Sequence, residues 1–352
     1  MEMRPLGRSD LKVSAAALGV MTFGSQTDEA EAFAQLDLAF ERGINFFDTA
    51  ENYPSPVLAE THGRSEQILG RWIKARGVRD RVVVATKITG PGNAVGDMSH
   101  IRGADRRLDR ANILAAVETS LKRLGVDYID HYQLHWPDRP ITTSRRQRYS
   151  YIPDAPEIVL LEDTLGALGE VVAAGKVRHI GVANETPWGV MRCLALSEQG
   201  GLPRIATIQN GYSLVDRSFE LELAEVAMRE QVGLMAFSPL AGGILTGKYL
   251  GADSPPPDSR AADNAGFAQR LKNTRMQAAA QAYVDIARRH GLDPADMALA
   301  FVRQRPFMTS VLVAARTVDQ LARNLKGVEL SLSREVVREI DAVHDAAPNP
   351  AR

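Results

Sequence analysis

The stretch INFFDTAENYP, residues 44–54, decides the fold class of this chain. It begins as a short apolar run of the kind that forms a buried β-strand, and the run ends abruptly at the carboxylate of Asp48. Tyr53 follows five residues later. A buried strand that ends in a carboxylate, with a phenol close behind it, predicts a functional residue at the end of that strand.

Further runs of this kind alternate with longer helical patterns, which is typical of repeated βα units on a parallel sheet. The eight predicted strands are 15–24, 44–50, 82–88, 128–136, 179–184, 206–212, 233–240 and 310–315. Between the strands, helices are expected near 29–42, 65–77, 111–124, 161–175, 187–199, 219–231 and 318–327. Two more helices are expected at 276–291 and 295–305, and a terminal one at 333–345. Several end at a glycine, namely Gly43, Gly77, Gly125 and Gly175.

Eight strands with helices between them predict an α/β chain folded as a (β/α)8 TIM barrel. The main alternative is a doubly wound open sheet, but no strand is followed by the glycine pattern G-x-G-x-x-G of that fold. We therefore expect residues 1–352 to form one barrel domain, with 346–352 as a frayed tail. Long loops at 89–110, 137–160 and 250–266 each follow a strand, so they are expected to cover the C-terminal face of the barrel.

The composition points to small-molecule ligands. The 42 basic and 43 acidic residues leave a net charge of -1, which argues against a nucleic acid or an anionic membrane surface as partner. The only cysteine, Cys193, excludes an intrachain disulfide and a cysteine-based metal cage, so no metal is expected. The chain has no run of about 18 apolar residues and no apolar leader, and a cytoplasmic location is the expectation.

Polar side chains stand at the ends of six predicted strands. At the C-terminal end of a barrel strand, such residues line the ligand pocket. Each also has a structural alternative: His135 could be a core histidine, Lys87 could extend its amine to water, and Asn184 could cap a helix. All six together favour a site, because burying a lysine and a carboxylate at strand ends is costly unless the two are paired. The six are Asp48, Lys87, His135, Asn184, Gln209 and Ser238.

This set of residues suits proton transfer. Asp48 and Lys87 end adjacent strands, so they are expected to form an ion pair, and Tyr53 can fold back over it. A lysine at ~4 Å and an effective dielectric constant of ~20 would favour the phenolate by roughly 4 kcal/mol, or about three pKa units. We therefore expect the pKa of Tyr53 to be lowered towards neutrality. His135 would then hydrogen-bond the same substrate oxygen through its neutral ring.

A proton donor beside an oxygen-binding group predicts carbonyl reduction, provided that a hydride source binds alongside. The amides of Asn184 and Gln209 match a carboxamide such as that of nicotinamide, and Phe237 could cover a flat ring.

These residues resemble a known family. Over nearly the whole chain, the sequence resembles the aldo-keto reductases, and the match is close to the Tas-type NADP(H)-dependent members. The segments similar to motifs of that group are GINFFDTAENYP, VVVATKITGP, YIDHYQLHWPDRP, KVRHIGVANET, RIATIQNGYSL, LAGGILTGKYL and TVDQLARNLK. The resemblance implies that Asp48, Tyr53, Lys87 and His135 are the catalytic tetrad, with Tyr53 as general acid.

The resemblance also implies a cofactor site for NADPH/NADP+. Asn184 and Gln209 would hold the carboxamide, and Phe237 would stack on the nicotinamide. Two departures from the family pattern stand out: Ala183 replaces a frequent serine, and Arg316 replaces a small residue where the 2'-phosphate of the adenosine should lie. A guanidinium there favours NADPH over NADH. The remaining residues implied are Ser238, Leu240, Gly242, Lys248 and Arg260 for the pyrophosphate, and Gln320 and Asn324 for the adenine end.

Two alternative functions remain at this point. One is a sensor or regulatory subunit that binds NADP(H), turns over slowly and contacts a partner, by analogy with relatives built into ion-channel assemblies. The other is a Schiff-base lyase or aldolase with Lys87 as the nucleophile. The reductase takes a small carbonyl compound as its partner and could be a homo-oligomer; the sequence identifies neither the substrate nor the direction of reaction in the cell.

Overall fold

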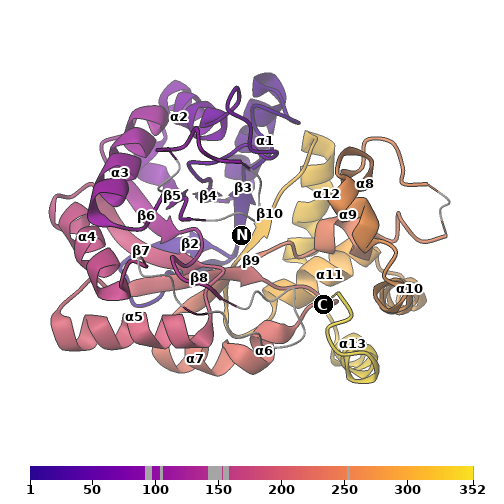
Figure 1. The fold of residues 1–352 in the computed structure, drawn as a ribbon. Helices are drawn as coiled ribbons and strands as arrows, with labels where there is room; N and C mark the ends of the chain where they lie inside the picture. Colours follow the sequence, from indigo (N-terminus) through magenta and orange to yellow (C-terminus); the bar gives the residue numbers. More distant parts are fainter. Residues whose placement is uncertain (92–96, 104–105, 142–152, 154–157, 252–253, 352) are drawn as a thin grey trace.

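Eight parallel strands form a closed barrel (Figure 1) in the computed structural model, which describes residues 1–91, 97–103, 106–141, 153, 158–251 and 254–351. Neighbouring strands pair in chain order, and the last strand pairs with the first to close the ring. The strands are β3 (Ala16–Gly19), β4 (Phe46–Asp48), β5 (Val83–Ile88), β6 (Ile129–Leu134), β7 (Val177–Ala183), β8 (Ile205–Gly211), β9 (Gly233–Phe237) and β10 (Met308–Val313). All eight lie within or overlap the predicted runs, and the (β/α)8 fold is confirmed.

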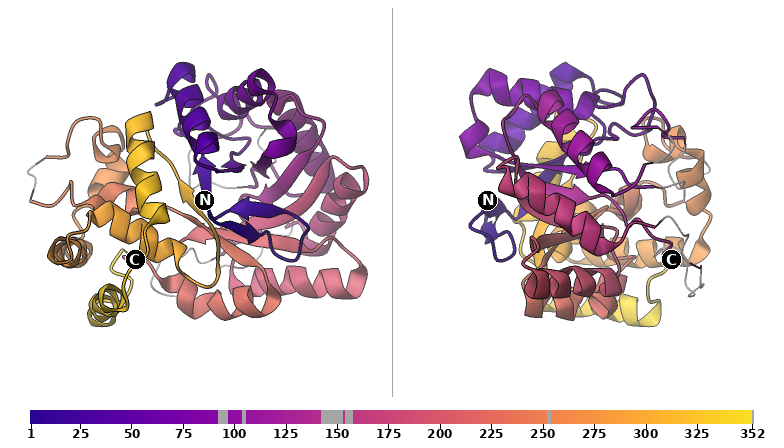
Figure 2. Two further views of the ribbon diagram at one scale, coloured as in Figure 1. Left: turned by 180° about the vertical axis from the view of Figure 1, so that it is seen from behind. Right: turned by 60° about the vertical axis from the view of Figure 1, so that its left-hand side comes forward.

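Helices surround the barrel as an outer layer (Figure 2). Those that match the predicted ones are α1 (Glu29–Glu41), α2 (Arg64–Arg76), α3 (Arg110–Leu124), α4 (Leu161–Ala173), α5 (Pro187–Gly200), α10 (Thr274–Arg289), α11 (Pro294–Arg303), α12 (Val318–Glu329) and α13 (Arg334–Ala346). Capping residues set their limits: Asp28 accepts from the backbone N–H of Glu31 at the start of α1, and Gly77 and Gly125 end α2 and α3 with φ of 60° and 63°.

Two local predictions were wrong or incomplete. The single helix expected at 219–231 is two helices, α6 (Ser218–Glu222) and α7 (Ala224–Glu230), because the buried Leu223 between them has a φ of -132°, outside the helical range. The loop expected at 250–266 contains the short helix α8 (Arg260–Asp263) and the start of α9 (Ala265–Arg270). Short 3-10 turns also occur at η1 (Arg79–Arg81) and η2 (Ala241–Thr246).

A two-stranded hairpin at the N-terminus, β1 (Met3–Pro5) with β2 (Lys12–Ser14), was not predicted from the sequence. Leu6 in its turn and Val13 are fully buried in one cluster with Phe46 and Met235 of the barrel. Gly7 lies so close to β8 that a Cβ there would be 2.4 Å from the carbonyl oxygen of Ala206. The hairpin therefore covers the end of the barrel at which the strands begin.

The end of the chain differs from the frayed tail expected at 346–352. Asn349 Oδ1 accepts from the backbone N–H of Arg217 at 2.7 Å, and the N–H of Ala351 donates to the carbonyl of Val215 at 3.1 Å. Asn273 Nδ2 donates to the carbonyl of Pro350 at 2.8 Å, and Pro350 is buried. Residues 349–351 are thus fixed to the barrel by hydrogen bonds that local composition does not indicate.

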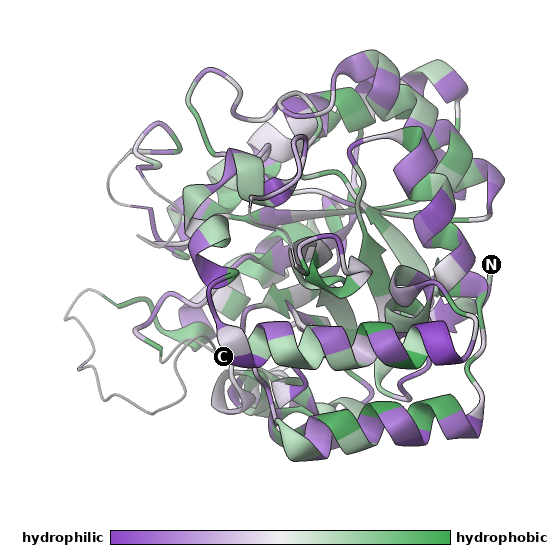
Figure 3. Ribbon diagram, turned by 90° about the vertical axis from the view of Figure 1, so that its right-hand side faces the viewer, coloured by the Kyte–Doolittle hydropathy of each residue, from purple (hydrophilic) through white to green (hydrophobic). Residues whose placement is uncertain are grey.

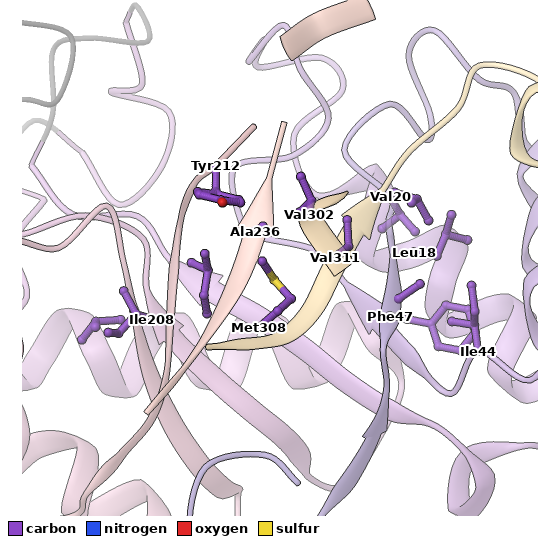
Figure 4. Packing of buried hydrophobic residues seen from close by; sticks show 14 of the residues in the cluster. Leu18, Val20, Ile44, Phe47, Ile208, Tyr212, Ala236, Val302, Met308 and Val311 are labelled. Carbon is purple, nitrogen blue, oxygen red and sulfur yellow. The ribbon is translucent and has the colours of Figure 1, made fainter. Parts of the chain in front are cut away.

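The main core fills the layer between strands and helices. Figure 4 shows Leu18, Ile44 and Phe47 together beside β3 and β4, with Val311 of β10 next in the row and Met308 of the same strand near Ala236 of β9. The ribbon in Figure 3 has green, apolar strands at the centre and helices with alternating purple and green residues around them, as expected for amphipathic helices on a buried sheet. None of the helices in the described ranges is both long and apolar enough to cross a membrane.

The contact between α2 and α3 gives a stability prediction. A Cβ at Gly70 in α2 would lie 2.1 Å from the carbonyl oxygen of Leu124, whereas a Cβ at Gly166 in α4 would meet nothing within 4 Å. We expect Gly70→Ala to lower the free energy of unfolding by about 3 kcal/mol through overpacking. The matched Gly166→Ala should be neutral or raise it by up to about 1 kcal/mol. Urea unfolding measures both, and equal stability of the two variants would contradict the close packing of α2 on α3.

Candidate active site

The site lies where the barrel strands end. Parallel strands bring their C-terminal ends to one face, and adjacent strands are in a register that pairs Asp48 with Ala85 and Lys87 with Gln133. Asp48 is the last residue of β4, Lys87 is next to the last of β5, and His135 directly follows β6. The structure thus brings the predicted Asp48, Lys87 and His135 to one end of the barrel interior.

A buried ion pair forms the floor of the site. Lys87 Nζ donates to Asp48 Oδ2 at 2.6 Å and to the carbonyl oxygen of Thr49 at 2.7 Å. The Lys87 side chain is fully buried and that of Asp48 is 2% exposed. The structural alternative for Lys87, an amine that reaches water, is therefore wrong. The two acceptors compensate for the burial of the amine and fix its position next to Asp48.

Two glutamines complete the coordination of Asp48. Gln133 Nε2 and Gln209 Nε2 both donate to Asp48 Oδ1, each at 3.0 Å, and Gln209 Nε2 also donates to Gln133 Oε1 at 3.1 Å. Both hydrogens of the Gln209 amide are used in this way, so any contact of Gln209 with a cofactor carboxamide would depend on its Oε1 alone. Gln133 was not predicted as a site residue, although its position two residues before His135 on β6 places both side chains on one face of the strand.

Tyr53 lies between the lysine and the histidine. Its ring centroid is 5.1 Å from Lys87 Nζ and 5.7 Å from the ring centroid of His135, to which it is nearly perpendicular at 82°. Burial raises the pKa of the phenol, and this outweighs the Lys87 charge, which lowers the pKa; Asp48 raises it further. The predicted fall of the Tyr53 pKa towards neutrality is therefore wrong, because the desolvation cost was left out of the argument.

His135 is a neutral imidazole. Burial holds its pKa well below the usual 6.5, and the Lys87 charge adds to that effect. Within the described ranges, its Nδ1 is buried without a hydrogen-bond partner. This differs from a core histidine with both nitrogens satisfied. The ring lies 4.6 Å from that of Trp136, whose Nε1 donates to the carbonyl of Pro91.

The ends of β6 and β7 are tied together beside His135. Asn184, which has a left-handed φ of 54°, donates through Nδ2 to the carbonyl oxygen of His135 at 2.9 Å. Thr186, and not Asn184, caps α5, so the capping alternative for Asn184 is wrong. The next residue, Glu185, is buried and forms an ion pair with Arg139, which was also not predicted from the sequence. Oδ1 of the exposed Asn184 is the group left for a ligand.

A turn with unusual backbone angles follows β9. Phe237 ends the strand half-buried, and its ring lies against Gly211, where a Cβ would be 3.2 Å from Cε2. Ser238 has a φ of 57°, and Gly242 and Gly243 follow with 70° and 95°. Non-glycine residues in this conformation are strained, which is frequent at binding sites. Leu240 anchors the turn by packing on the main core.

Two cations flank this glycine turn. A Cβ at Gly243 would be 2.8 Å from Cε of Lys248, and one at Gly242 would be 3.5 Å from Cδ of Arg260. The charge of Arg260 also reaches Tyr53, whose pKa it lowers. Ser238, Gly242, Lys248 and Arg260, the residues expected to bind the pyrophosphate, thus lie in or beside this turn.

The three residues predicted for the adenosine end lie together after β10, and each has a partner within the protein. The backbone N–H of Arg316 donates to Gln320 Oε1 at 3.0 Å, and Asn324 Nδ2 donates to the carbonyl of Ala314 at 3.3 Å. The Arg316 guanidinium is ion-paired with Asp263 of α8, a residue that the sequence did not suggest.

Glu51, in the opening stretch of sequence, has a structural role. Its carboxylate is buried, accepts from the backbone N–H of Thr89 and forms an ion pair with Arg102. Burial raises its pKa, and Arg102 offsets part of the rise. The network ties the loop after β4 to the loop after β5, and so fixes the segment that contains Tyr53.

Neither a metal site nor a reactive thiol is found among the described residues. These contain no cluster of histidine, cysteine and acidic side chains that could hold a metal ion. Cys193 is buried, and burial raises the pKa of its thiol to about 12, so it is unreactive. The basic stretch at 144–148 lies outside the described residues.

Comparison with known proteins identifies the family of this chain. Residues 16–345 match the model of the aldo/keto reductase family. The chain is 49% identical to Protein tas of Escherichia coli strain K12 over all of both chains. It is 35% identical to the uncharacterized oxidoreductase YrpG of Bacillus subtilis, covering 99% of this chain and 97% of the relative. A probable voltage-gated potassium channel subunit beta of rice is 30% identical, covering 99% and 98%. The chain therefore belongs to the aldo-keto reductase family.

Proposed function

We propose that this protein reduces aldehydes or ketones to alcohols with NADPH, with Tyr53 as the general acid. Its membership of the aldo-keto reductase family supports oxidoreductase activity on carbonyl groups. The observation that supports this most directly is the phenol beside a buried, charged lysine and a neutral histidine, since these are the groups needed to protonate an oxygen and to hold it.

The residues present suit a nicotinamide dinucleotide. The glycine turn after β9, flanked by Lys248 and Arg260, offers backbone approach and positive charge to a pyrophosphate. Asn184 Oδ1 and Gln209 Oε1 are acceptors for carboxamide hydrogens, and the half-buried ring of Phe237 offers a flat surface. When bound, the cofactor supplies the hydride.

The protein's own groups handle the proton and the charge. Tyr53 is protonated at neutral pH, because its pKa is raised, so the proton is present when a carbonyl oxygen needs it. As the proton leaves, Lys87 stabilises the negative charge that develops on the phenolate oxygen. His135, which cannot donate as an imidazolium, contributes a neutral N–H to the substrate oxygen.

Other functions have less support. The potassium channel subunits among the relatives favour a sensor subunit as the second candidate, and negligible turnover on every carbonyl tried, together with a stable protein partner, would support it. A Schiff-base mechanism is disfavoured because Lys87 is held by Asp48 and the Thr49 carbonyl. Borohydride trapping with carbonyl substrates should therefore give no adduct on Lys87.

Fluorescence titration with NADPH, followed by NADPH oxidation in the presence of an aromatic aldehyde, tests the proposal. Binding with turnover is expected. Binding without turnover would move the interpretation to the sensor subunit, and a lack of binding would overturn the assignment of the site.

Removal of the Tyr53 hydroxyl should separate chemistry from binding. We expect Tyr53→Phe to lower kcat by about 10²–10⁴-fold, as is typical for the loss of a general acid, with Kd for NADPH within about twofold of the wild type. Tyr132→Phe is the matched control, since the buried Tyr132 hydroxyl has no partner in the described part of the chain. Activity retained in Tyr53→Phe would assign the proton donor elsewhere.

The raised pKa of Tyr53 predicts an asymmetric pH dependence. In the reductive direction the required species is the phenol, so kcat/KM should stay flat from about pH 7 to about pH 9. In the oxidative direction the required species is the phenolate, so kcat/KM should rise about tenfold per pH unit over this range. His135 contributes no change there because it is already neutral. A reductive rate that falls tenfold per unit above pH 7 would show a phenol with a pKa near 7 instead.

A further inference from the structure

The guanidinium of Arg316 has two partners in a single turn of the chain. Nη1 of Arg316 donates to the backbone carbonyl of Asp258 at 2.9 Å, and Nη2 forms a short ion pair with the carboxylate of Asp263. The Arg316 side chain is 22% exposed and that of Asp263 is 46% exposed. The two partners are five residues apart, at the two ends of the segment 258–263, which we call the α8 turn.

The α8 turn is shaped to make both contacts. Asp258 has a left-handed φ of 61°, an unfavourable conformation for a residue with a side chain, and Ser259 caps α8 by accepting from the N–H of Ala262. Arg260 in the same turn packs on Phe267 and lies beside Gly242 of the glycine turn. One short segment therefore contacts both the residue predicted for the 2'-phosphate and the turn predicted for the pyrophosphate.

We propose that Asp263 is a specificity-determining residue: its carboxylate competes with the 2'-phosphate of NADPH for Arg316, and so lowers the preference for NADPH over NADH. This rests on the proposed function, in which Arg316 faces the adenosine. Nη1 and Nη2 each donate one N–H to the α8 turn, so at most three of the five guanidinium N–H donors are left for the phosphate, and Asp263 already offsets the positive charge.

The competition acts differently on the two cofactors. A phosphate monoester has a charge of about -1.5 to -2 near neutrality and three acceptor oxygens, so it is a stronger partner for a guanidinium than one carboxylate. NADPH can therefore displace Asp263, at the cost of the existing ion pair and with a carboxylate left near the phosphate. NADH has an uncharged 2'-hydroxyl and leaves the pair of Arg316 and Asp263 in place.

Fluorescence titration of five proteins with NADPH and with NADH tests this proposal. The variants are Asp263→Asn, Arg316→Gln, the double variant and Asp258→Asn. The last is a matched control, because it removes one negative charge from the same turn while residue 258 keeps its carbonyl contact, and asparagine tolerates the left-handed conformation.

We expect Asp263→Asn to bind NADPH about 3–10-fold more tightly and NADH within about twofold of the wild type. Arg316→Gln should weaken NADPH about tenfold or more with little effect on NADH, and Asp263→Asn should have no effect on NADPH in the Arg316→Gln background. Asp258→Asn should leave the ratio of the two Kd values unchanged.

Three outcomes would overturn the inference. These are an unchanged Kd ratio in Asp263→Asn, an equal gain in Asp258→Asn, or a gain that persists without Arg316, since each would mean that Asp263 does not act through Arg316. A wild-type protein that binds neither cofactor would instead overturn the proposed function, so the two failures are distinguishable.

Discussion

The fully buried ion pair of Lys87 and Asp48 is the interaction on which the rest of the site depends. A lone ammonium in this interior would cost several kcal/mol, and the pair is tolerated because Lys87 donates to two oxygens and Asp48 accepts from Lys87 and two glutamines. Gln133 and Gln209 hold the second carboxylate oxygen, and so three strands besides β4 contribute to one charge network. The barrel must close in the observed register for these groups to meet.

The same buried cation acts on two neighbours in opposite senses. It lowers the pKa of Tyr53, against the larger effect of burial, and it adds to the burial that keeps His135 neutral. The result is a protonated phenol and a neutral imidazole next to the amine of Lys87. Lys87 therefore stabilises Tyr53 most strongly as the phenol loses its proton, and an interaction that strengthens at that step increases the rate.

Much of the fold and of the candidate site could be predicted from the sequence, and the predictions that were wrong or missing share one cause. The eight strands and the grouping of Asp48, Lys87 and His135 follow from periodicity and from the geometry of parallel strands. The pKa of Tyr53 and the hydrogen bonds of Gln209 depend on how many atoms crowd each group, which no local pattern contains. Gln133 looked like an ordinary strand residue, and the α8 turn and the hydrogen bonds of residues 349–351 are made between segments far apart in the chain.

The N-terminal hairpin determines from which end of the barrel a ligand can approach the site. Leu6 and Val13 fill the end of the barrel opposite the site, in contact with Phe46 and Met235. The barrel is therefore closed at this end, and a ligand approaches the site from the face where the strands end and leaves by the same face. Two ligands that react with each other must lie at that face together, so the order in which they bind and leave depends on which of them lies deeper.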